Sequence, residues 1–207
     1  MKVCVLMWYD GAIADYADSN FAINKEYCLK HGLALLCSGD RACPGRHPAW
    51  ERLPLILKVL PSYDWVVWVD ADAHFYRDAP DIKEMLSGHP DKDMIFSGDK
   101  PPRGNINTGI FAVKRTEFSR MFVERWLKDE EAYSANRFPG WWEQGVLIDM
   151  WERNVEGVRD RCAMLEYGKL QHFYPGDRGG DAPLVFHMAE QEHEARVAHS
   201  KDYLGEN

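Results

Sequence analysis

Short apolar runs alternate with amphipathic stretches from the first residues of the chain. Residues 2–8 form an apolar run rich in β-formers, and the turn-like pair Asp10-Gly11 follows it, which predicts a buried strand that opens into a loop. Apolar positions recur at helical spacing over 18–31, and Gly32 is a suitable helix stop. The apolar residues 33–37 then predict a second strand.

The same alternation continues to the end of the chain. Residues 65–69 are nearly all β-branched or aromatic, which favours a central strand covered on both faces. We further predict helices over 50–60, 80–88, 116–131 and 143–152, strands over 93–97, 106–113 and 184–188, and loops over 38–48 and 174–183. Strands alternating with helices imply an α/β fold with a mainly parallel central sheet, in which ligands bind beyond the carboxyl ends of the strands.

Length and charge limit the classes of protein to consider. A chain of 207 residues with 45% hydrophobic content can bury one sizeable core, so we expect a single domain over 1–207. Its last residues carry no clear stop, so this domain could be the N-terminal part of a longer chain. The net charge is −8 and no stripe of Lys and Arg occurs, which argues against nucleic acid as a partner.

Cysteine usage and hydropathy bear on the compartment. The five cysteines form an odd set without paired spacing, which fits a reducing environment. The apolar opening run lacks the layout of a signal peptide, and no run approaches the roughly 20 residues of a membrane helix. We therefore expect a cytoplasmic protein without membrane insertion.

The segment Asp70-Ala71-Asp72 follows the predicted central strand. Two carboxylates one residue apart repel each other unless a cation lies between them, so the pair predicts a divalent metal that would clamp a diphosphate. An ordinary acidic strand end is the alternative. His187, inside an apolar run, is either a core histidine or a third ligand. With His187 the mixed oxygen and nitrogen set favours Mn²⁺, with Mg²⁺ as the second choice.

Two further polar groups could contact a sugar. Asn107 and Thr108 stand on a predicted turn and can hydrogen-bond sugar hydroxyls, while Gly109 would let a ligand approach the backbone. An ordinary β-turn explains the same residues equally well. Glu143 and Gln144 follow two tryptophans, so an acid and an amide could lie behind an aromatic wall, although a first-turn Glu is also common at a helix start.

Five blocks occur in order along the chain: NKEYCLKHG (24–32), WERLPLILKVLPSYDWVVWVDADAHF (50–75), NTGIFAVKRTEFS (107–119), EQGVL (143–147) and FHMAE (186–190). Together they resemble the GT-A-fold glycosyltransferases. They are similar above all to the retaining family of plant xyloglucan xylosyltransferases, galactomannan galactosyltransferases, and fungal α-galactosyl- and mannosyltransferases. A chain of this family that we expect to have no membrane anchor also resembles the capsid-glycosylating enzymes of large algal viruses. This resemblance would imply the host cytoplasm.

The resemblance implies a role for each matching position. Asp70 and Asp72 match the family's metal-binding aspartates, and His187 matches its late metal-ligand histidine. Asn107 matches a residue near the donor sugar. An acidic-amide pair beneath the anomeric carbon corresponds to Glu143-Gln144, although the family usually has Asp at the first of these positions.

The nucleotide side of the site is less well defined by the resemblance. The end of the first strand, with Met7, Tyr9 and Asp10, corresponds to the place where such enzymes hold uracil and ribose, and we include Ala71 and Thr108 among the donor contacts. The family's diphosphate-contacting Lys is replaced here by Met188-Ala189-Glu190. Arg178 or Lys169 could substitute for it.

These residues together predict a metal-dependent glycosyltransferase. The resemblance implies that it would move a sugar from a UDP-sugar to a glycan or glycoprotein acceptor with retention of configuration. Gln144 is a poor nucleophile, so Glu143 is the only plausible carboxylate if a covalent intermediate forms. Two alternatives remain open: a module that binds a nucleotide sugar or glycan without turnover, and a phosphatase of the haloacid dehalogenase type, which also uses a DxD motif, although on its first strand.

Overall fold

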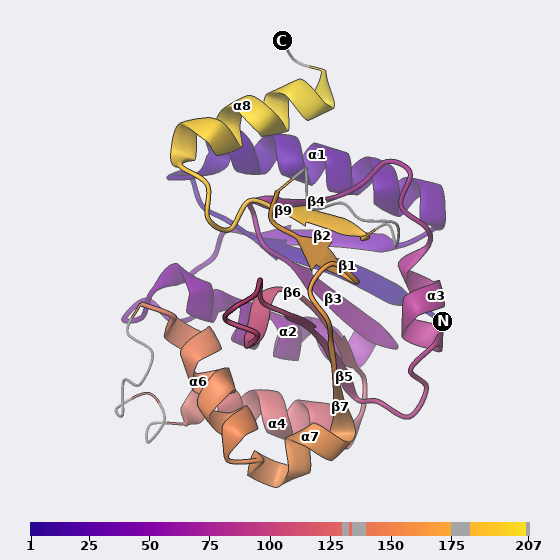
Figure 1. Cartoon of the computed structure of the whole chain (residues 1–207), viewed down its shortest axis with the longest axis vertical. Helices are drawn as coiled ribbons and strands as arrows, with labels where there is room; N and C mark the ends of the chain where they lie inside the picture. The colour runs from indigo at the N-terminus through magenta and orange to yellow at the C-terminus, as the bar shows by residue number, and fades with distance from the viewer. Residues whose placement is uncertain (130–132, 134–139, 175–182, 206–207) are drawn as a thin grey trace.

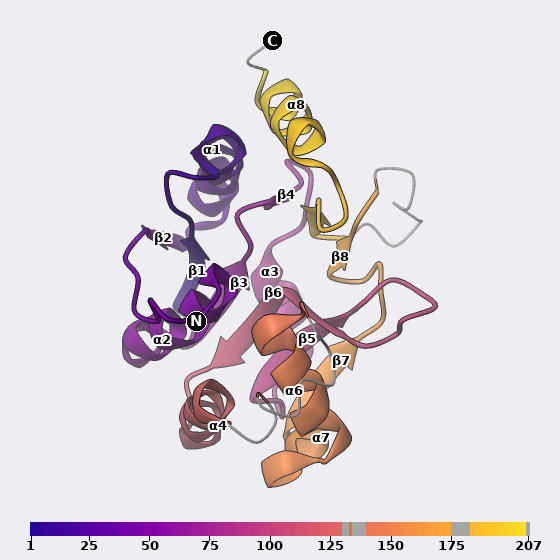
Figure 2. The same cartoon turned by 90° about the vertical axis from the view of Figure 1, so that its left-hand side faces the viewer.

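The computed structural model describes residues 1–129, 133, 140–174 and 183–205. A six-stranded sheet forms the centre of the molecule, with helices on both sides (Figures 1 and 2). In spatial order its strands are β2 (Ala34–Ser38), β1 (Val3–Trp8), β3 (Trp65–Val69), β6 (Ile106–Lys114), β5 (Met94–Gly98) and β7 (Cys162–Leu165).

One strand of this sheet runs against the others. β2, β1 and β3 are mutually parallel, β5 and β7 are parallel, and β6 pairs antiparallel with both β3 and β5. The prediction of a mainly parallel α/β sheet is therefore confirmed. Because β6 is reversed, its amino end lies at the edge where β1 and β3 end. Val69 pairs with Ile110, and Asp70 N donates a hydrogen bond to Gly109 O (2.8 Å).

A second sheet of three short strands lies beside that edge. In it, β9 (Val185–His187) pairs antiparallel with β4 (Ala73–Phe75) and parallel with β8 (Gln171–His172). The sequence pattern did not predict β4, β7 or β8, because two to four residues are too few to show an alternation. The register places Ala73 opposite His187, which brings the late histidine next to the aspartates.

The helices form two groups. Figures 1 and 2 place α1 and α8 on one side of the main sheet and α2, α4, α6 and α7 on the other. The helix over 193–204 was not predicted, whereas the predicted helices near 18–31, 50–60, 80–88, 116–131 and 143–152 are confirmed with shifted ends. The helices are α1 (Ala14–His31), α2 (Arg52–Val59), α3 (Ile82–Ser87), α4 (Glu117–Lys128), α6 (Trp142–Glu152), α7 (Val158–Arg161) and α8 (His193–Leu204), with short 3-10 turns at Pro48–Glu51, Leu60–Ser62 and Val155–Gly157.

The central strand β3 is buried on both faces, as its composition predicts. Val66 and Trp68 pack in the core under α2, α4 and α6, whereas Val67 and Val69 pack in the core under α1 and α3. Fully burying a side chain of this size contributes about 1.5–3 kcal/mol. Burial on both faces keeps β3 in the centre of the sheet, and its parallel pairing with β1 means that the aspartates after β3 emerge at the edge where β1 ends.

Helix α1 holds the segment that carries those aspartates. The side chain of Asn20 donates to Ala71 O (2.9 Å), and Asn24 donates to Ala73 O (3.1 Å) and accepts from Phe75 N (2.9 Å). Both asparagines are fully buried. Since backbone groups buried without partners are costly, these amides fix the path of the chain between β3 and β4.

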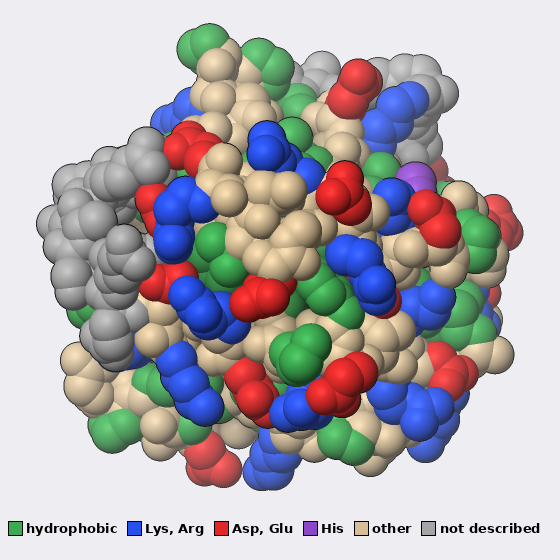
Figure 3. Space-filling model, turned by 90° about the horizontal axis from the view of Figure 1, so that it is seen from below, with side chains coloured by type: hydrophobic (Ala, Val, Ile, Leu, Met, Phe, Trp, Pro, Cys, Tyr) green, Lys and Arg blue, Asp and Glu red, His purple; other side chains and the backbone are tan. Residues whose placement is uncertain are grey.

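The surface carries both signs of charge. On the face shown in Figure 3, Lys and Arg side chains are interspersed with Asp and Glu. Within the described residues no helix is long and apolar enough to cross a bilayer.

We predict that Asn24→Leu destabilises the fold. The substitution removes the acceptor for Phe75 N–H in a buried position, and an unsatisfied buried donor costs about 1–3 kcal/mol. Urea unfolding should show a lower free energy of unfolding by about that amount. The same exchange at the exposed neighbour Lys25 serves as the control, and an equal loss in both variants would contradict the anchoring role of Asn24.

Candidate active site

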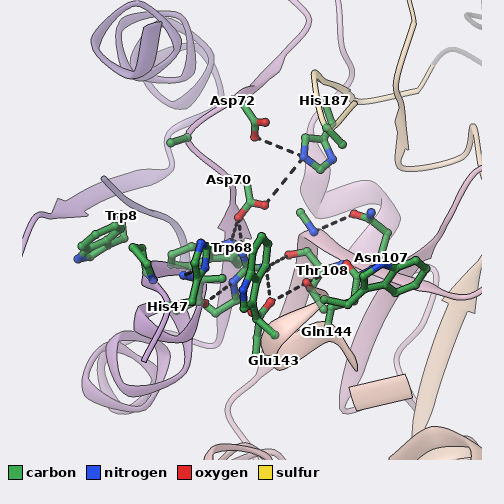
Figure 4. A pocket seen from close by; sticks show the side chains of 18 of the residues that line it. Trp8, His47, Trp68, Asp70, Asp72, Asn107, Thr108, Glu143, Gln144 and His187 are labelled. Carbon is green, nitrogen blue, oxygen red and sulfur yellow. Dashed lines mark hydrogen bonds and ion pairs between the residues drawn. The ribbon is translucent and has the colours of Figure 1, made fainter. Parts of the chain in front are cut away.

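A cavity of about 630 Å³ opens where β1 and β3 end and β6 begins. This volume is in the range of small-molecule sites in proteins. Most of the predicted site residues lie in its wall, and Figure 4 shows them converging from the main sheet, the small sheet and α6. The wall includes Asp10, Asp70, Ala71, Asp72, Asn107, Thr108, Glu143, Gln144 and His187.

The structure brings the two aspartates and the late histidine together. His187 Nε2 lies 3.4 Å from Asp72 Oδ1 and 3.9 Å from Asp70 Oδ2 (Figure 4). One ligand atom from each of the three residues falls within 4.8 Å of the others, and among the described residues this is the one such group of His, Cys, Asp and Glu. The other ring nitrogen, Nδ1, hydrogen-bonds to Gln171 Oε1 (2.8 Å), so Nε2 faces the carboxylates. Two carboxylate oxygens and an imidazole nitrogen form a donor set that fits a divalent metal.

Gly109 makes room for the imidazole. A Cβ atom at this position would lie 2.0 Å from His187 Cε1, a distance that no real side chain permits. From the sequence we expected the missing side chain to admit a ligand to the backbone. The structure gives a different reason for glycine, because His187 itself occupies that space.

The two aspartates differ in their electrostatic surroundings. Burial acts to raise the pKa of Asp72, but His187 and Arg196 outweigh it and hold that pKa at about 2. Arg196 contributes through an ion pair of 3.2 Å to Asp72 Oδ2. Burial raises the pKa of Asp70, and the nearby Asp72 charge adds to the rise, while Arg52 and His187 oppose it. The two carboxyl groups therefore lie close together, with only a few cationic side chains beside them to offset their charge.

Arg52 is a central residue of the site that the sequence did not reveal. It is almost fully buried at the start of α2 and forms ion pairs of 3.0 Å with both Asp70 and Glu143. It also donates to Thr108 O (2.6 Å). An arginine in an amphipathic helix is normally solvent-facing, so only the need of two buried carboxylates for a cation could have indicated its role.

The acidic-amide pair on α6 is tied to the turn at the start of β6. Thr108 Oγ1 donates to Glu143 Oε1 (2.9 Å), and Thr108 N donates to Gln144 Oε1 (2.9 Å). Glu143 is 1% exposed, and burial raises its pKa against the opposing effect of Arg52. Glu143 Oε2 accepts no hydrogen bond from the described residues. These contacts explain why the two sequence motifs lie together.

The residues predicted for the nucleotide are only partly in the cavity wall. Asp10 lies in the wall, but the side chain of Met7 is fully buried in the core and does not face the cavity. The Tyr9 hydroxyl donates to Asp18 Oδ1 (2.8 Å), and its side chain is not part of the wall. Trp8, between them, does line the cavity, although the prediction for this strand end did not name it individually. Strand alternation explains this, since successive side chains point to opposite faces.

The predicted substitutes for the missing family Lys are not confirmed. Arg178 lies outside the described residues, and Lys169 is not part of the cavity wall. Arg103 and Arg196 are in the wall instead. Arg196 comes from α8, which the sequence did not predict as a helix, so its position could not have been expected.

Aromatic side chains form part of the wall, as the Trp-Trp pair before Glu143 indicated. Trp141 and Trp142 both line the cavity. The Trp142 ring stacks on His47 with 3.6 Å between ring centroids and 3° between the planes. Rings of this kind provide flat apolar surface in the wall of the cavity.

Sequence comparison gives the family. The family described as nucleotide-diphospho-sugar transferase matches residues 47–199, well over half of the chain. Probable glycosyltransferase 6 of Oryza sativa subsp. indica is 28% identical over 221 residues, which cover 91% of this chain and 44% of the rice protein. Galactomannan galactosyltransferase 1 of Cyamopsis tetragonoloba is 26% identical over 125 residues, which cover 56% of this chain and 28% of that protein. The chain thus spans less than half the length of these relatives.

Structural comparison gives the fold. A solved glycosyltransferase involved in the glycosylation of the major capsid of PBCV-1 superposes with a TM-score of 0.79 at 19% identity, over 98% of this chain and all of that chain. The fold is that of the GT-A glycosyltransferases. These matches confirm the family resemblance that the five sequence blocks indicate.

We predict that Arg52→Met destabilises the protein by about 3–5 kcal/mol at neutral pH, because it leaves two buried carboxylates without their cation. The loss should shrink as the pH falls. The pKa values of Asp70 and Glu143 are already raised in the folded state, and loss of Arg52 would raise them further. As the pH falls, the folded variant therefore takes up protons at a higher pH than the unfolded chain does, and this uptake stabilises the folded state.

Urea unfolding at neutral pH and at about pH 5 measures both effects. Arg115→Met, which breaks an exposed ion pair with Asp64, is the matched control and should have little effect. A loss in Arg52→Met that grows on acidification would contradict this account of the charges.

Proposed function

The chain belongs to the nucleotide-diphospho-sugar transferase family, and we propose on that premise that it transfers a sugar from a UDP-sugar to a glycan or glycoprotein acceptor, with a divalent metal and with retention of configuration. The observation that carries the proposal is the convergence of Asp70, Asp72 and His187 on one cavity with the Glu143-Gln144 pair. The name of one comparison protein refers to a galactomannan and that of another to a capsid protein, so the relatives are compatible with a glycan or a glycoprotein acceptor.

Asp70, Asp72 and His187 would hold the metal. Their oxygen and nitrogen donors favour Mn²⁺, with Mg²⁺ as the second choice. When bound, such a cation neutralises the charge that grows on a departing diphosphate. The protein's own contribution is to fix the three ligands: α1 holds the chain at Ala71, and the small sheet holds His187 over Gly109.

Arg196 is the cation best placed to contact the diphosphate. It lines the cavity within ion-pair distance of Asp72, on the same side as the metal ligands. It also donates to Met188 O (3.1 Å), which holds its guanidinium near the segment where the family has its Lys. A guanidinium offers several donors in a plane and suits phosphate oxygens.

The other side of the cavity would take the reacting sugar. Gln144 Oε1 already accepts Thr108 N–H, so its amide nitrogen is the group left to donate to a ligand. The Glu143 carboxylate contacts Arg52 and Thr108. We infer that it stabilises the reacting sugar through its charge, because a nucleophile would have to leave both partners. We therefore favour attack by the acceptor hydroxyl on the face from which the diphosphate leaves, with the rate coming from orientation and electrostatics.

A module that binds without turnover is the remaining alternative. Its support is the Glu at position 143, where the family usually has Asp, and the absence of the family's Lys. The phosphatase alternative has lost its support, because the aspartates follow β3 rather than the first strand and the family match is to nucleotide-diphospho-sugar transferases.

We predict that Asp72→Asn abolishes Mn²⁺-dependent release of UDP from UDP-sugars. The loss should be at least about 100-fold, because the substitution removes one of two charged ligands. The assay screens UDP-sugars for slow donor hydrolysis and for transfer, with circular dichroism to verify the fold. Asp91→Asn, at an exposed position away from the cavity, is the control.

Two outcomes would change the assignment. Full activity in Asp72→Asn would remove the metal site. Binding of UDP by the wild-type protein without release of UDP from any UDP-sugar would instead favour the binding module.

We predict that Arg196→Met weakens UDP binding in the presence of Mn²⁺ by roughly ten- to a hundredfold, as expected for the loss of a charge-assisted hydrogen bond. Isothermal titration calorimetry with UDP measures the change, and Arg159→Met on the exposed side of α7 is the control. Equal UDP affinity in both variants would assign the phosphate contact to another cation, such as Arg103.

A further inference from the structure

A chain of hydrogen bonds leads from the backbone of β6 to the metal-facing histidine. It begins at Gly109 N–H, which donates to Asn107 Oδ1 (2.8 Å). A backbone N–H can only donate, so the Asn107 atom at this place must be the amide oxygen. This fixes the orientation of an amide that the positions of its heavy atoms alone would leave open.

The same oxygen accepts a second hydrogen bond, from Gln171 Nε2 (2.8 Å). The amide nitrogen of Gln171 therefore faces Asn107, and its oxygen faces His187. Gln171 Oε1 lies 2.8 Å from His187 Nδ1. Because an amide oxygen can only accept, Nδ1 must carry the proton, and in the neutral ring Nε2 carries the lone pair.

The small sheet builds this contact. β8 pairs parallel with β9 and places Gln171 beside Val185. His187 is two residues beyond Val185, so its side chain projects from the same face of the sheet as that of Val185. Gln171 is fully buried and His187 is 4% exposed, so water cannot replace the hydrogen bond between them without cost.

We propose that Gln171 is a positioning residue, which holds His187 in the Nδ1–H tautomer and aims the Nε2 lone pair at the ion bound by Asp70 and Asp72. The inference rests on the metal site of the proposed function. The same hydrogen bonds affect Asn107. Its Oδ1 already accepts two hydrogen bonds, so only its amide nitrogen is presented to the cavity. The orientation of His187 thus depends on one buried glutamine, whose own orientation is set by Asn107.

The test compares two substitutions of Gln171. Gln171→Met keeps the length of the side chain but removes both hydrogen bonds, and the dissociation constant for Mn²⁺ should rise about 10–100-fold. Gln171→Glu retains an acceptor for Nδ1–H and should recover most of that affinity. Mn²⁺ alone is the probe, measured by the loss of the free-ion signal in electron paramagnetic resonance, so no sugar or acceptor is needed.

Gln191→Met is the matched control for removal of an amide. Gln191 donates to Phe173 O (3.2 Å) and has no contact with His187, so this variant should bind Mn²⁺ as the wild type does. Wild-type affinity in folded Gln171→Met, or equal losses in the Met and Glu variants, would overturn the proposal. A wild-type protein that binds no Mn²⁺ would instead overturn the metal site of the proposed function.

A second measurement does not depend on metal binding. Imidazole ¹⁵N spectra of the metal-free protein at alkaline pH should show His187 protonated at Nδ1 in the wild type and a mixture of tautomers in Gln171→Met. The His187 signals are assigned from their loss in His187→Gln. Protonation of the wild-type ring at Nε2 would overturn the proposal, even if the Gln171 variants fail to fold.

Discussion

The electrostatic repulsion among three acidic side chains constrains the whole site. Asp70, Asp72 and Glu143 lie at one edge of the sheet, and each is mostly or fully buried. Arg52 and Arg196 compensate part of this charge from opposite sides, one from α2 and one from α8. The geometry of the cavity follows from where these cations can be placed, because a buried carboxylate without a partner would destabilise the fold.

The sequence predicted the parts of the fold that are long and regular. β3 and the pair of aspartates after it could be placed because an all-apolar strand must be covered on both faces and must end where polar residues begin. β4 and β8 could not be placed, since three and two residues carry no periodicity. Yet these strands bring His187 to Asp72, so the sequence could connect the two only through the family resemblance.

The side chains that support the site were harder to predict than those that face the cavity. Asn107 and Glu143 stand in motifs that can be recognised, whereas Arg52 and Gln171 act through tertiary contacts between residues far apart in the chain. Met7 is a residue that the sequence assigned to the nucleotide but whose side chain lies in the core. The end of β1 was placed correctly, but which of its side chains face the cavity depends on a register that one sequence does not fix.

The packing of α8 against α1 has a consequence for how the protein is made. Ser200 on α8 donates to Asn20 on α1, and Asn20 in turn holds Ala71 between the two aspartates. Asp70 and Asp72 are synthesised well before His187 and Arg196, which stand much later in the chain. The charge balance of the pocket is complete only once α8 packs against α1, because the arginine beside Asp72 comes from α8.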